Sequence, residues 1–373
     1  MKTTTKKALL SVTALLLAAS TLTACSNGAG NGSSASSGSN GAGASSAKIG
    51  LLLPDSVTAR YASADRPLFT AEVKKDCSGC TVLYANADGD ASKQLQQAQS
   101  MLTQGVKVLV LDPFDGEAAA SIVQQAKAKN VPVISYDRLI DSPDLAYYIS
   151  FDNEKVGELQ GQALVDALKA KKVPSGSGII MVNGSPTDNN ASQFKAGAHK
   201  IIDTSGYKVL AEYDTPGWDP AKAQDWASGQ ISKLGASKIT GVYAANDDTG
   251  GAVIAALKAA GVKTMPPVTG QDASLAGIQR ILAGQQYMTV YKAFKPEAND
   301  AADIAVDLAG GKAADLPTTA TTAKGATVKA ELLTPVAVTT SNIESTVVKD
   351  GLYKVSAICT SAYAADCTKY GVK

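Results

Sequence analysis

The stretch VKVLVLDPFDGEAAASIVQQAKAKNVPVISYDR, residues 106–138, decides the fold class. Two short apolar runs, 106–112 and 131–136, flank a segment that reads as a helix. A strand, a helix and a strand in this order predict two parallel strands joined by a crossover helix. Because the same alternation continues on both sides, the sequence predicts an α/β protein whose parallel sheets are covered on both faces.

Further strands and helices are predicted outward from this stretch. Before it and just after it, strands are expected at 49–53, 81–86 and 147–150, with helices at 64–75 and 90–105. A second series has strands at 178–184, 207–213, 239–247 and 266–272, and helices near 190–203, 220–234 and 249–261. About ten strands are too many for one comfortable doubly wound sheet, so we expect two lobes.

Composition and missing motifs limit the classes of function. The 373 residues carry 35 basic and 34 acidic side chains, which gives no electrostatic footprint for nucleic acid. The single histidine, His199, falls inside a predicted helix. No GxSxG, GxxxxGK[ST] or HExxH motif occurs, and NDDTGG (246–251) lacks the ordered acids of a calcium loop. We therefore expect no cofactor and no metal.

The N-terminal residues are typical of an export signal. Three lysines precede the apolar stretch 8–19, which runs into Leu-Thr-Ala-Cys at 22–25. This resembles a bacterial lipoprotein signal, so residues 1–24 would be removed and Cys25 acylated; an ordinary secretory peptide is the alternative. Residues 25–47, nearly all Gly, Ser, Ala and Asn, predict a flexible linker. We expect an exported protein, lipid-anchored to the outer face of the cell membrane.

Four further cysteines agree with export. Cys77 and Cys80 stand in CSGC, and Cys359 and Cys367 stand near the C-terminus. In an oxidising compartment two local disulfides, 77–80 and 359–367, are the simplest pairing. A redox role for CSGC is an alternative, although CSGC follows a predicted helix and precedes a strand, unlike a thioredoxin motif. A four-cysteine zinc site is another, although nothing in the sequence brings the two pairs together.

Polar and charged side chains follow nearly every predicted strand. Ligands of open parallel sheets bind outside the carboxyl ends of the strands. The loops there carry Arg60, Tyr61, Asp65, Arg66, Asp137, Arg138, Asp188, Asn189, Asn190, Trp218, Asn246, Asp247, Gln271, Asp272, Tyr291 and Lys292. Capping of the next helix is the alternative role for each single Asp or Asn. Their recurrence over seven loops favours one shared cleft.

These side chains suit a neutral sugar. A carboxylate accepts a hydrogen bond from one hydroxyl, Arg or Lys donates to its neighbour, and an amide does both. The apolar face of a pyranose packs on an aromatic ring. A phosphate would instead need cations without matching carboxylates. No nucleophile–base pair is evident, and a glycosidase that uses Asp137 and Asp272 is the enzymatic alternative.

Five segments together carry a resemblance to a known family: residues 136–166, 184–197, 246–261, 270–292 and 331–354. In consistent order, from about Lys48 to Lys354, the sequence resembles the bacterial D-xylose-binding proteins, which are solute receptors of ATP-driven sugar importers in the periplasmic binding-protein and LacI-like superfamily. The resemblance implies the type I architecture, two Rossmann-like lobes joined by a three-strand hinge. The lobes would comprise residues 48–151 with 293–330, and 152–292 with 331–373. The tail 355–373 lies outside the resemblance.

The resemblance also implies which residues contact the sugar. One position departs from the family, because Tyr61 stands where the family has Trp, and the sequence leading to Arg60 matches weakly. The implied contacts are Arg60, Tyr61, Asp65, Arg66, Asp137, Arg138, Asn190, Trp218, Asn246, Asp247, Asp272 and Lys292.

The function implied is that of a monomeric receptor without enzymatic activity. It would bind a monosaccharide, D-xylose or a similar aldose, and dock on the membrane permease of a sugar ABC transporter. Alternatives are a receptor of the same fold for glucose, galactose, ribose or arabinose that serves chemosensing, and an extracellular glycosidase. A LacI-type regulator would need an N-terminal helix-turn-helix, where this sequence has the export signal and linker.

Overall fold

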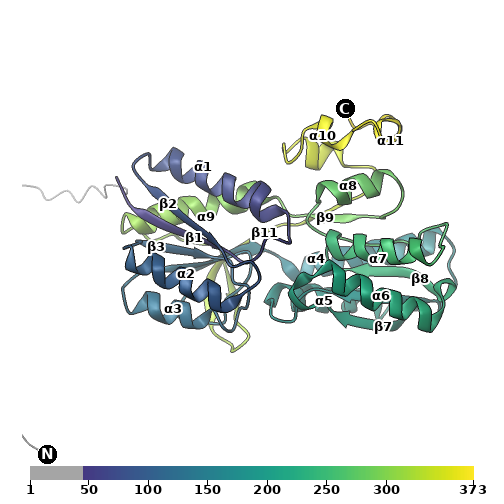
Figure 1. Cartoon of the computed structure of the whole chain (residues 1–373), viewed down its shortest axis with the longest axis horizontal. Helices are drawn as coiled ribbons and strands as arrows, with labels where there is room; N and C mark the ends of the chain where they lie inside the picture. Colours follow the sequence, from purple (N-terminus) through teal and green to yellow (C-terminus); the bar gives the residue numbers. More distant parts are fainter. Residues whose placement is uncertain (1–44) are drawn as a thin grey trace, which may run out of the picture. The chain divides into compact units, whose positions relative to one another are not determined.

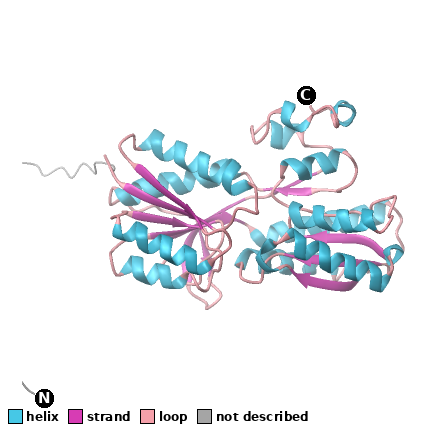
Figure 2. Cartoon of the chain, in the orientation of Figure 1, coloured by secondary structure: helices cyan, strands magenta, loops and turns pink. Residues whose placement is uncertain are grey.

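The computed structural model describes residues 45–373, which lie within one compact unit. The expected signal segment 1–24, the acylated Cys25 and the linker up to residue 44 lie outside the described residues. Strands and helices alternate through most of the chain, as Figures 1 and 2 show. The predicted fold class, α/β with parallel sheets, is confirmed.

The first sheet has seven strands in the order β10-β11-β5-β4-β3-β1-β2. All neighbours pair in parallel except the edge pair β10–β11, which is antiparallel and was not predicted. Its two strands are joined by a turn too short for the crossover that a parallel pair needs. The strands are β1 (Lys48–Leu53), β2 (Thr81–Asn86), β3 (Val108–Leu111), β4 (Val133–Tyr136), β5 (Tyr147–Phe151), β10 (Thr318–Thr321) and β11 (Thr327–Leu333).

Helices cover both faces of this sheet. On one face, Leu51 and Leu53 of β1 pack against α1 (Arg66–Asp76) and α9 (Phe294–Ala309). On the other, Leu52 packs against α2 (Ala91–Thr103) and α3 (Ala120–Lys127). This two-sided burial explains why β1 is a continuous apolar run rather than an alternating one. Figure 1 shows the two helix layers on opposite sides of the strands. A short π-helix, η1 (Tyr61–Asp65), leads into α1.

The second sheet has three parallel strands in the order β7-β6-β8. One face packs against α4 and α5, and the other against α6 and α7. The elements are α4 (Asn153–Ala170), β6 (Gly178–Asn183), α5 (Asn189–Ile202), β7 (Lys208–Asp214), η2 (Pro216–Trp218), α6 (Pro220–Leu234), η3 (Ala236–Lys238), β8 (Ile239–Ala244) and α7 (Asp247–Ala259).

The strand predicted at 266–272 is wrong, because this segment makes only two isolated bridges, Val242–Val268 and Gln271–Val290. Two neighbouring prolines begin the segment and cannot donate to a ladder. At its end Asp272 has φ 87°, so the backbone turns away from an extended course.

A third group of elements follows the second sheet. The strand β9 (Thr289–Tyr291) pairs antiparallel with β12 (Val336–Val338). Helix α8 (Leu275–Leu282) packs with the C-terminal elements η4 (Glu344–Val348), α10 (Val355–Ile358) and α11 (Ala364–Tyr370) in one apolar cluster. The chain thus leaves the first sheet after β5, returns to it from β9 through α9, and leaves it again after β11.

The four described cysteines lie in two close pairs. The sulfur atoms are 1.97 Å apart in Cys77–Cys80 and 2.01 Å apart in Cys359–Cys367. These are the two local pairs that the sequence analysis favours. Among residues 45–373, no helix combines the length and apolar character needed to cross a bilayer.

Candidate functional site

A cavity lies where loops from both sheets meet. Most of its residues follow the carboxyl ends of strands, where the sequence analysis expects a cleft. Thirteen residues line it: Thr58, Arg60, Tyr61, Asp137, Arg138, Asp188, Asn190, Phe194, Trp218, Asn246, Gln271, Asp272 and Lys292. Nine of these are among the twelve predicted contact residues: Arg60, Tyr61, Asp137, Arg138, Asn190, Trp218, Asn246, Asp272 and Lys292.

The charged groups that line the cavity balance one another. The acids are Asp137, Asp188 and Asp272, and the bases are Arg60, Arg138 and Lys292. Amides of Asn190, Asn246 and Gln271 and the rings of Tyr61, Phe194 and Trp218 complete the lining. A cavity with equal numbers of opposite charges, each held by a partner, suits a neutral ligand rich in hydroxyl groups.

Asp137 stands at the centre of the charged groups. Its backbone has φ 53°, an uncommon conformation for a residue with a side chain, and such strain clusters at functional sites. Its Oδ1 lies 2.9 Å from Lys292 Nζ and 3.2 Å from Arg60 Nη1. Burial would raise the pKa of Asp137, but Arg60 and Lys292 together hold this pKa below its ordinary value. Asp137 is therefore a fixed carboxylate acceptor.

Arg138 is held by groups from both sheets. Its Nη2 donates to the hydroxyl of Tyr61 at 3.0 Å, and its Nε lies 3.1 Å from Asp188 Oδ2. Behind it, Asp55 and Asp112 lie at 3.5 and 3.7 Å. Burial, opposed by Arg138, raises the pKa of Asp112 well above its ordinary value. The guanidinium is thus fixed at the wall of the cavity rather than free to move with solvent.

Asp188 connects the aromatic wall to Arg138. Its Oδ1 accepts from the backbone N–H of Asn190 as a helix cap, and its Oδ2 accepts from Trp218 Nε1 at 3.0 Å. Trp218 has φ 57° and packs edge-on against Phe194, with ring centroids 6.3 Å apart. A Cβ at Gly184 would lie 2.1 Å from the Trp218 ring, so this close approach requires glycine.

Asn190 links the second sheet to the loop after β4. Its Nδ2 donates to the backbone carbonyl of Asp137 at 2.8 Å, and its Oδ1 lies 3.1 Å from the hydroxyl of Tyr148. Asn190 lies on α5, whereas Asp137 and Tyr148 belong to the first sheet region. The contact therefore fixes two parts of the cavity wall that come from different sheets.

The remaining amides and one acid lie at the ends of β8 and of the bridged segment after it. Asn246 caps α7, because its Oδ1 accepts from the N–H of Thr249 at 2.9 Å. Asn246 therefore caps α7 and also lines the cavity. Gln271 Nε2 donates to Asp272 Oδ1 at 3.2 Å. Burial raises the pKa of Asp272, while Lys292 opposes this rise.

Three predicted residues do not line the cavity. Asp65 lies behind Arg60, with its Oδ1 2.7 Å from Arg60 Nη2. Arg66 stacks over the ring of Tyr84, with its Cζ 4.1 Å from the ring centroid. Asp247 faces the turn before α8, where its Oδ2 accepts from the N–H of Ser274 at 2.7 Å.

Four lining residues are not among the predicted contacts. Asp188 and Gln271 are polar residues at strand ends, but the family resemblance does not imply them as contacts. Thr58 precedes η1, and Phe194 lies more than one turn into α5. Phe194 reaches the cavity from a helix face, so a rule based on strand ends could not find it. Its apolar neighbours in α5 look the same in sequence.

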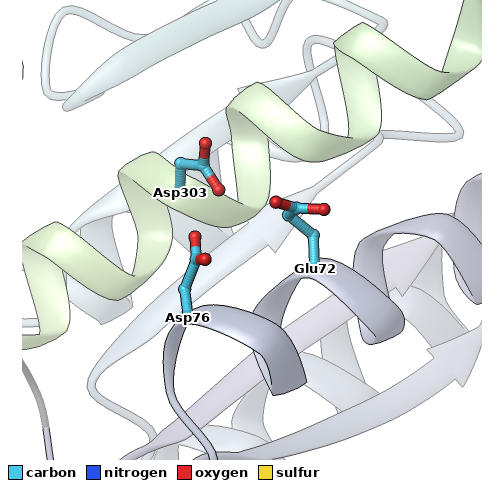
Figure 3. A group of neighbouring side chains, drawn as sticks. All are labelled: Glu72, Asp76 and Asp303. Carbon is cyan, nitrogen blue, oxygen red and sulfur yellow. The ribbon is translucent and has the colours of Figure 1, made fainter.

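One acidic cluster lies elsewhere, between α1 and α9 (Figure 3). It consists of Glu72, Asp76 and Asp303, and it is the one group among residues 45–373 whose acidic ligand atoms lie within 4.8 Å of one another. Burial and a hydrogen bond with Asp76 raise the pKa of Asp303 to about 7. Lys75 forms an ion pair with Glu72 and lies 3.8 Å from Asp76. The cluster is therefore partly neutralised by a proton and by lysine.

Comparison with known proteins gives a consistent result. The sequence matches the family described as periplasmic binding protein domain over residues 49–313. It is 41% identical to the D-xylose-binding periplasmic protein of Escherichia coli over 83% of this chain and 92% of that protein. It is 33% identical to a multiple sugar-binding periplasmic receptor of Rhizobium radiobacter, over 82% of this chain and 90% of that protein.

A solved structure is similar as well. A carbohydrate transporter solute binding protein from Chloroflexus aurantiacus, in complex with D-glucose, superposes with a TM-score of 0.75 at 30% identity. The similarity covers 84% of this chain and 98% of that one.

Proposed function

This chain belongs to the periplasmic binding protein domain family, and from that membership and the lining of its cavity we propose that it binds a monosaccharide as the receptor of a sugar ABC importer. The observation that carries the proposal is the balanced set of three carboxylates, three cations and three amides beside aromatic rings. Each hydroxyl of a neutral sugar both donates and accepts, so this set can satisfy adjacent hydroxyls in pairs.

D-Xylose is the sugar we propose first, with similar aldoses as alternatives. The relatives with 41% and 39% identity are named D-xylose-binding periplasmic proteins. The Tyr61 hydroxyl accepts a hydrogen bond from Arg138, which a Trp ring at this position could not do. Tyr61 thus gives this chain a polar group where the family has an indole. Receptors for glucose, galactose, ribose or arabinose, including ones that serve chemosensing, remain the alternatives to test.

The sugar-contact residues that we propose are the nine predicted residues in the lining, with Asp188, Phe194 and Gln271 added. Residues 48–151 with 293–330 would form one lobe, and 152–292 with 331–373 the other. Support comes from the sheet order, since β5 and β11 belong to the first sheet and β6, β7 and β8 to the second. Residues 331–333, the end of β11, still pair with β5, so the strand itself crosses the division at residue 330. Because Arg138 and Asn190 come from different lobes in this division, a bound sugar would favour closure.

We propose further that the protein acts outside the cell membrane and performs no chemistry. The N-terminal sequence supports export and acylation of Cys25, and the close sulfur pairs support two disulfides in an oxidising compartment. A membrane permease would be its partner, and it would work as a monomer. The enzymatic alternative is a glycosidase that would use Asp137 as the carboxylate and Asp272 as the acid, and only a test for turnover separates it from a receptor.

A thermal-shift screen tests the proposal, because a ligand that binds the folded state raises the melting temperature. D-Xylose, ribose, arabinose, glucose and galactose would be compared at equal concentrations, with mannitol as an acyclic control. We expect a rise with at least one of the aldoses, largest with D-xylose, and little with mannitol. No rise with any aldose would contradict the proposal. Release of free sugar from a panel of disaccharides would favour the glycosidase instead.

A further inference from the structure

Arg60 is held from behind by two carboxylates that do not line the cavity. Its Nε and Nη2 donate to the two oxygens of Asp65, at 2.9 and 2.7 Å. Its Nη2 also donates to Glu297 Oε2 at 2.6 Å. The ring of Phe294 lies against the guanidinium, with 4.1 Å between Arg60 Cζ and the ring centroid. Three of the five N–H groups of the guanidinium are therefore occupied on the side away from the cavity.

The other terminal nitrogen of Arg60 is left for the cavity. Nη1 lies 3.2 Å from Asp137 Oδ1, in contact but without the geometry of a hydrogen bond. Within residues 45–373, Nη1 is a buried nitrogen with no hydrogen-bond partner. A buried donor without a partner is costly, and a hydroxyl of a ligand in the cavity would satisfy it.

We propose that Glu297 is a positioning residue for sugar recognition, which fixes Arg60 so that Nη1 alone faces the cavity. The inference rests on the function proposed above and names a residue outside the cavity lining. Glu297 is completely buried on the first turn of α9, and its sequence position is 237 residues from Arg60. The sequence alone does not identify Glu297 as part of the site, because it lies within a helix and does not directly follow a strand.

Asp65 alone could not fix the guanidinium in the same way. Asp65 and Arg60 lie five residues apart around η1, so the two can move together as one turn. Glu297 comes from a different helix and anchors that turn to α9. Without Glu297, one N–H of Nη2 would be a buried donor without a partner, which favours a shift of the guanidinium and with it of Nη1.

The same short segment also fixes the partner of Asp137. Lys292 follows β9, Phe294 begins α9, and Glu297 completes its first turn. Lys292 donates to Asp137 Oδ1 at 2.9 Å, while Phe294 and Glu297 hold Arg60. Residues 292–297 therefore set the geometry of both cations that contact Asp137. This segment is the passage by which the chain returns from β9 to the first sheet.

The test compares calorimetric titrations of D-xylose into the wild-type protein and into variants of Glu297 and Arg60. Glu297→Met keeps the buried volume but removes the acceptor, and we expect it to weaken binding by about tenfold or more, as for the loss of a buried hydrogen bond to a charged group. Glu297→Gln keeps an acceptor for Nη2, and we expect it to stay within about threefold of wild type. In an Arg60→Ala background, Glu297→Met should change the affinity by less than about twofold, because the two residues act as one unit.

Glu72→Ala is the matched control, since Glu72 is a glutamate on α1 near α9 that does not touch Arg60. Its affinity should equal that of the wild type. If Glu297→Met fails to fold, Glu297→Asp decides, because it keeps the charge but withdraws the acceptor by one methylene. We expect Glu297→Asp to bind about tenfold more weakly.

The outcomes separate this inference from the proposed function. A wild-type protein that binds neither D-xylose nor another aldose contradicts the function itself. A wild-type protein that binds, with Glu297→Met or Glu297→Asp at wild-type affinity, overturns only the positioning role. A loss that persists undiminished in the Arg60→Ala background also overturns it, because Glu297 would then act independently of Arg60.

Discussion

Asn190 on α5 donates through Nδ2 to the backbone carbonyl of Asp137, 2.8 Å away, and so holds the loop that carries Arg138. The hydroxyls of Tyr148 and Ser150 lie 3.0 and 2.6 Å from the same carbonyl. The carbonyl of Asp137, just after β4, thus accepts hydrogen bonds from side chains that belong to both sheet regions. Asp137 itself has φ 53°, in the left-handed region of the backbone.

Replacement of Asn190 by alanine should weaken sugar binding by about tenfold or more, because both the amide and its hold on Asp137 are lost. Calorimetric titration with D-xylose measures this effect. Asn189→Ala is the control, since Asn189 is adjacent in α5 but does not line the cavity. If the two variants bound D-xylose with equal affinity, Asn190 would not contribute to sugar binding.

Replacement of Arg138 by alanine should cost about 2–4 kcal/mol of binding free energy, as expected for the removal of a charged partner from a buried hydrogen-bonded site. The change also leaves Asp188 without its cation, so we expect a lower melting temperature as well. Arg66→Ala provides the comparison, because Arg66 stacks on Tyr84 outside the cavity and should be neutral for affinity. If Arg138→Ala weakened sugar binding less than Arg66→Ala, Arg138 would not be a sugar-contact residue.

The part of the site that follows strand ends could be predicted from sequence. Asp137, Arg138 and Asn246 stand directly after β4 and β8, and the topology of parallel strands brings such residues to one edge. Phe194 and Glu297 could not be predicted in this way, because they act from helix faces whose direction depends on packing. Arg66 and Asp247 show the opposite failure: each begins a helix near a strand end, and nearness to a strand end does not determine which way a side chain points.

The fold prediction failed in two places where the chain departs from the alternation of parallel strands and crossover helices. The edge hairpin β10–β11 depends on a tight turn whose residues, Thr322 to Ala326, have no strong turn signature apart from one glycine. The segment 266–272 is apolar enough for a strand. However, its backbone bonds are divided between Val242 of β8 on one side and Val290 of β9 on the other, so it forms isolated bridges and no continuous ladder.

The carboxyl group of Asp303 should make stability depend on pH. Burial and the hydrogen bond with Asp76 raise its folded pKa to about 7, above the ordinary value of 3.8. The folded protein therefore holds a proton that the unfolded chain releases. Its stabilising effect is complete below about pH 4 and is lost as pH rises toward 7. Because Asp303 is largely exposed, we expect this proton to contribute less than about 1 kcal/mol to the free energy of unfolding.

Asp303→Asn separates this effect from the other acids (Figure 3), since an amide donates to Asp76 without a titrating proton. Urea unfolding at pH 4, 6 and 8 should show a flatter profile for Asp303→Asn than for wild type, with the variant more stable at pH 8. Asp307→Asn, later on α9 and 3.5 Å from Lys312, is the control. A variant profile parallel to that of wild type would contradict the shared proton.

The C-terminal cysteine pair should stabilise the tail against α8. The double change Cys359→Ser and Cys367→Ser opens a loop with a separation of eight residues, and the chain-entropy estimate for such a loop is about 2–3 kcal/mol. Gln279 on α8 donates to the carbonyl of Ala357 at 3.2 Å, so loosening of the tail should expose this helix. Urea unfolding without reducing agent measures the loss. The matching change at Cys77 and Cys80 opens a shorter loop and should cost less stability.

The cavity between the two sheets is the central element of the account, and a calorimetric titration of the purified protein with D-xylose tests it most directly. We predict saturable binding of one sugar per chain, abolished or strongly weakened by Arg138→Ala, with the sugar recovered unchanged afterwards. Absence of saturable heat with D-xylose, and equally with ribose, arabinose, glucose and galactose, would contradict the claim that this cavity is a monosaccharide site.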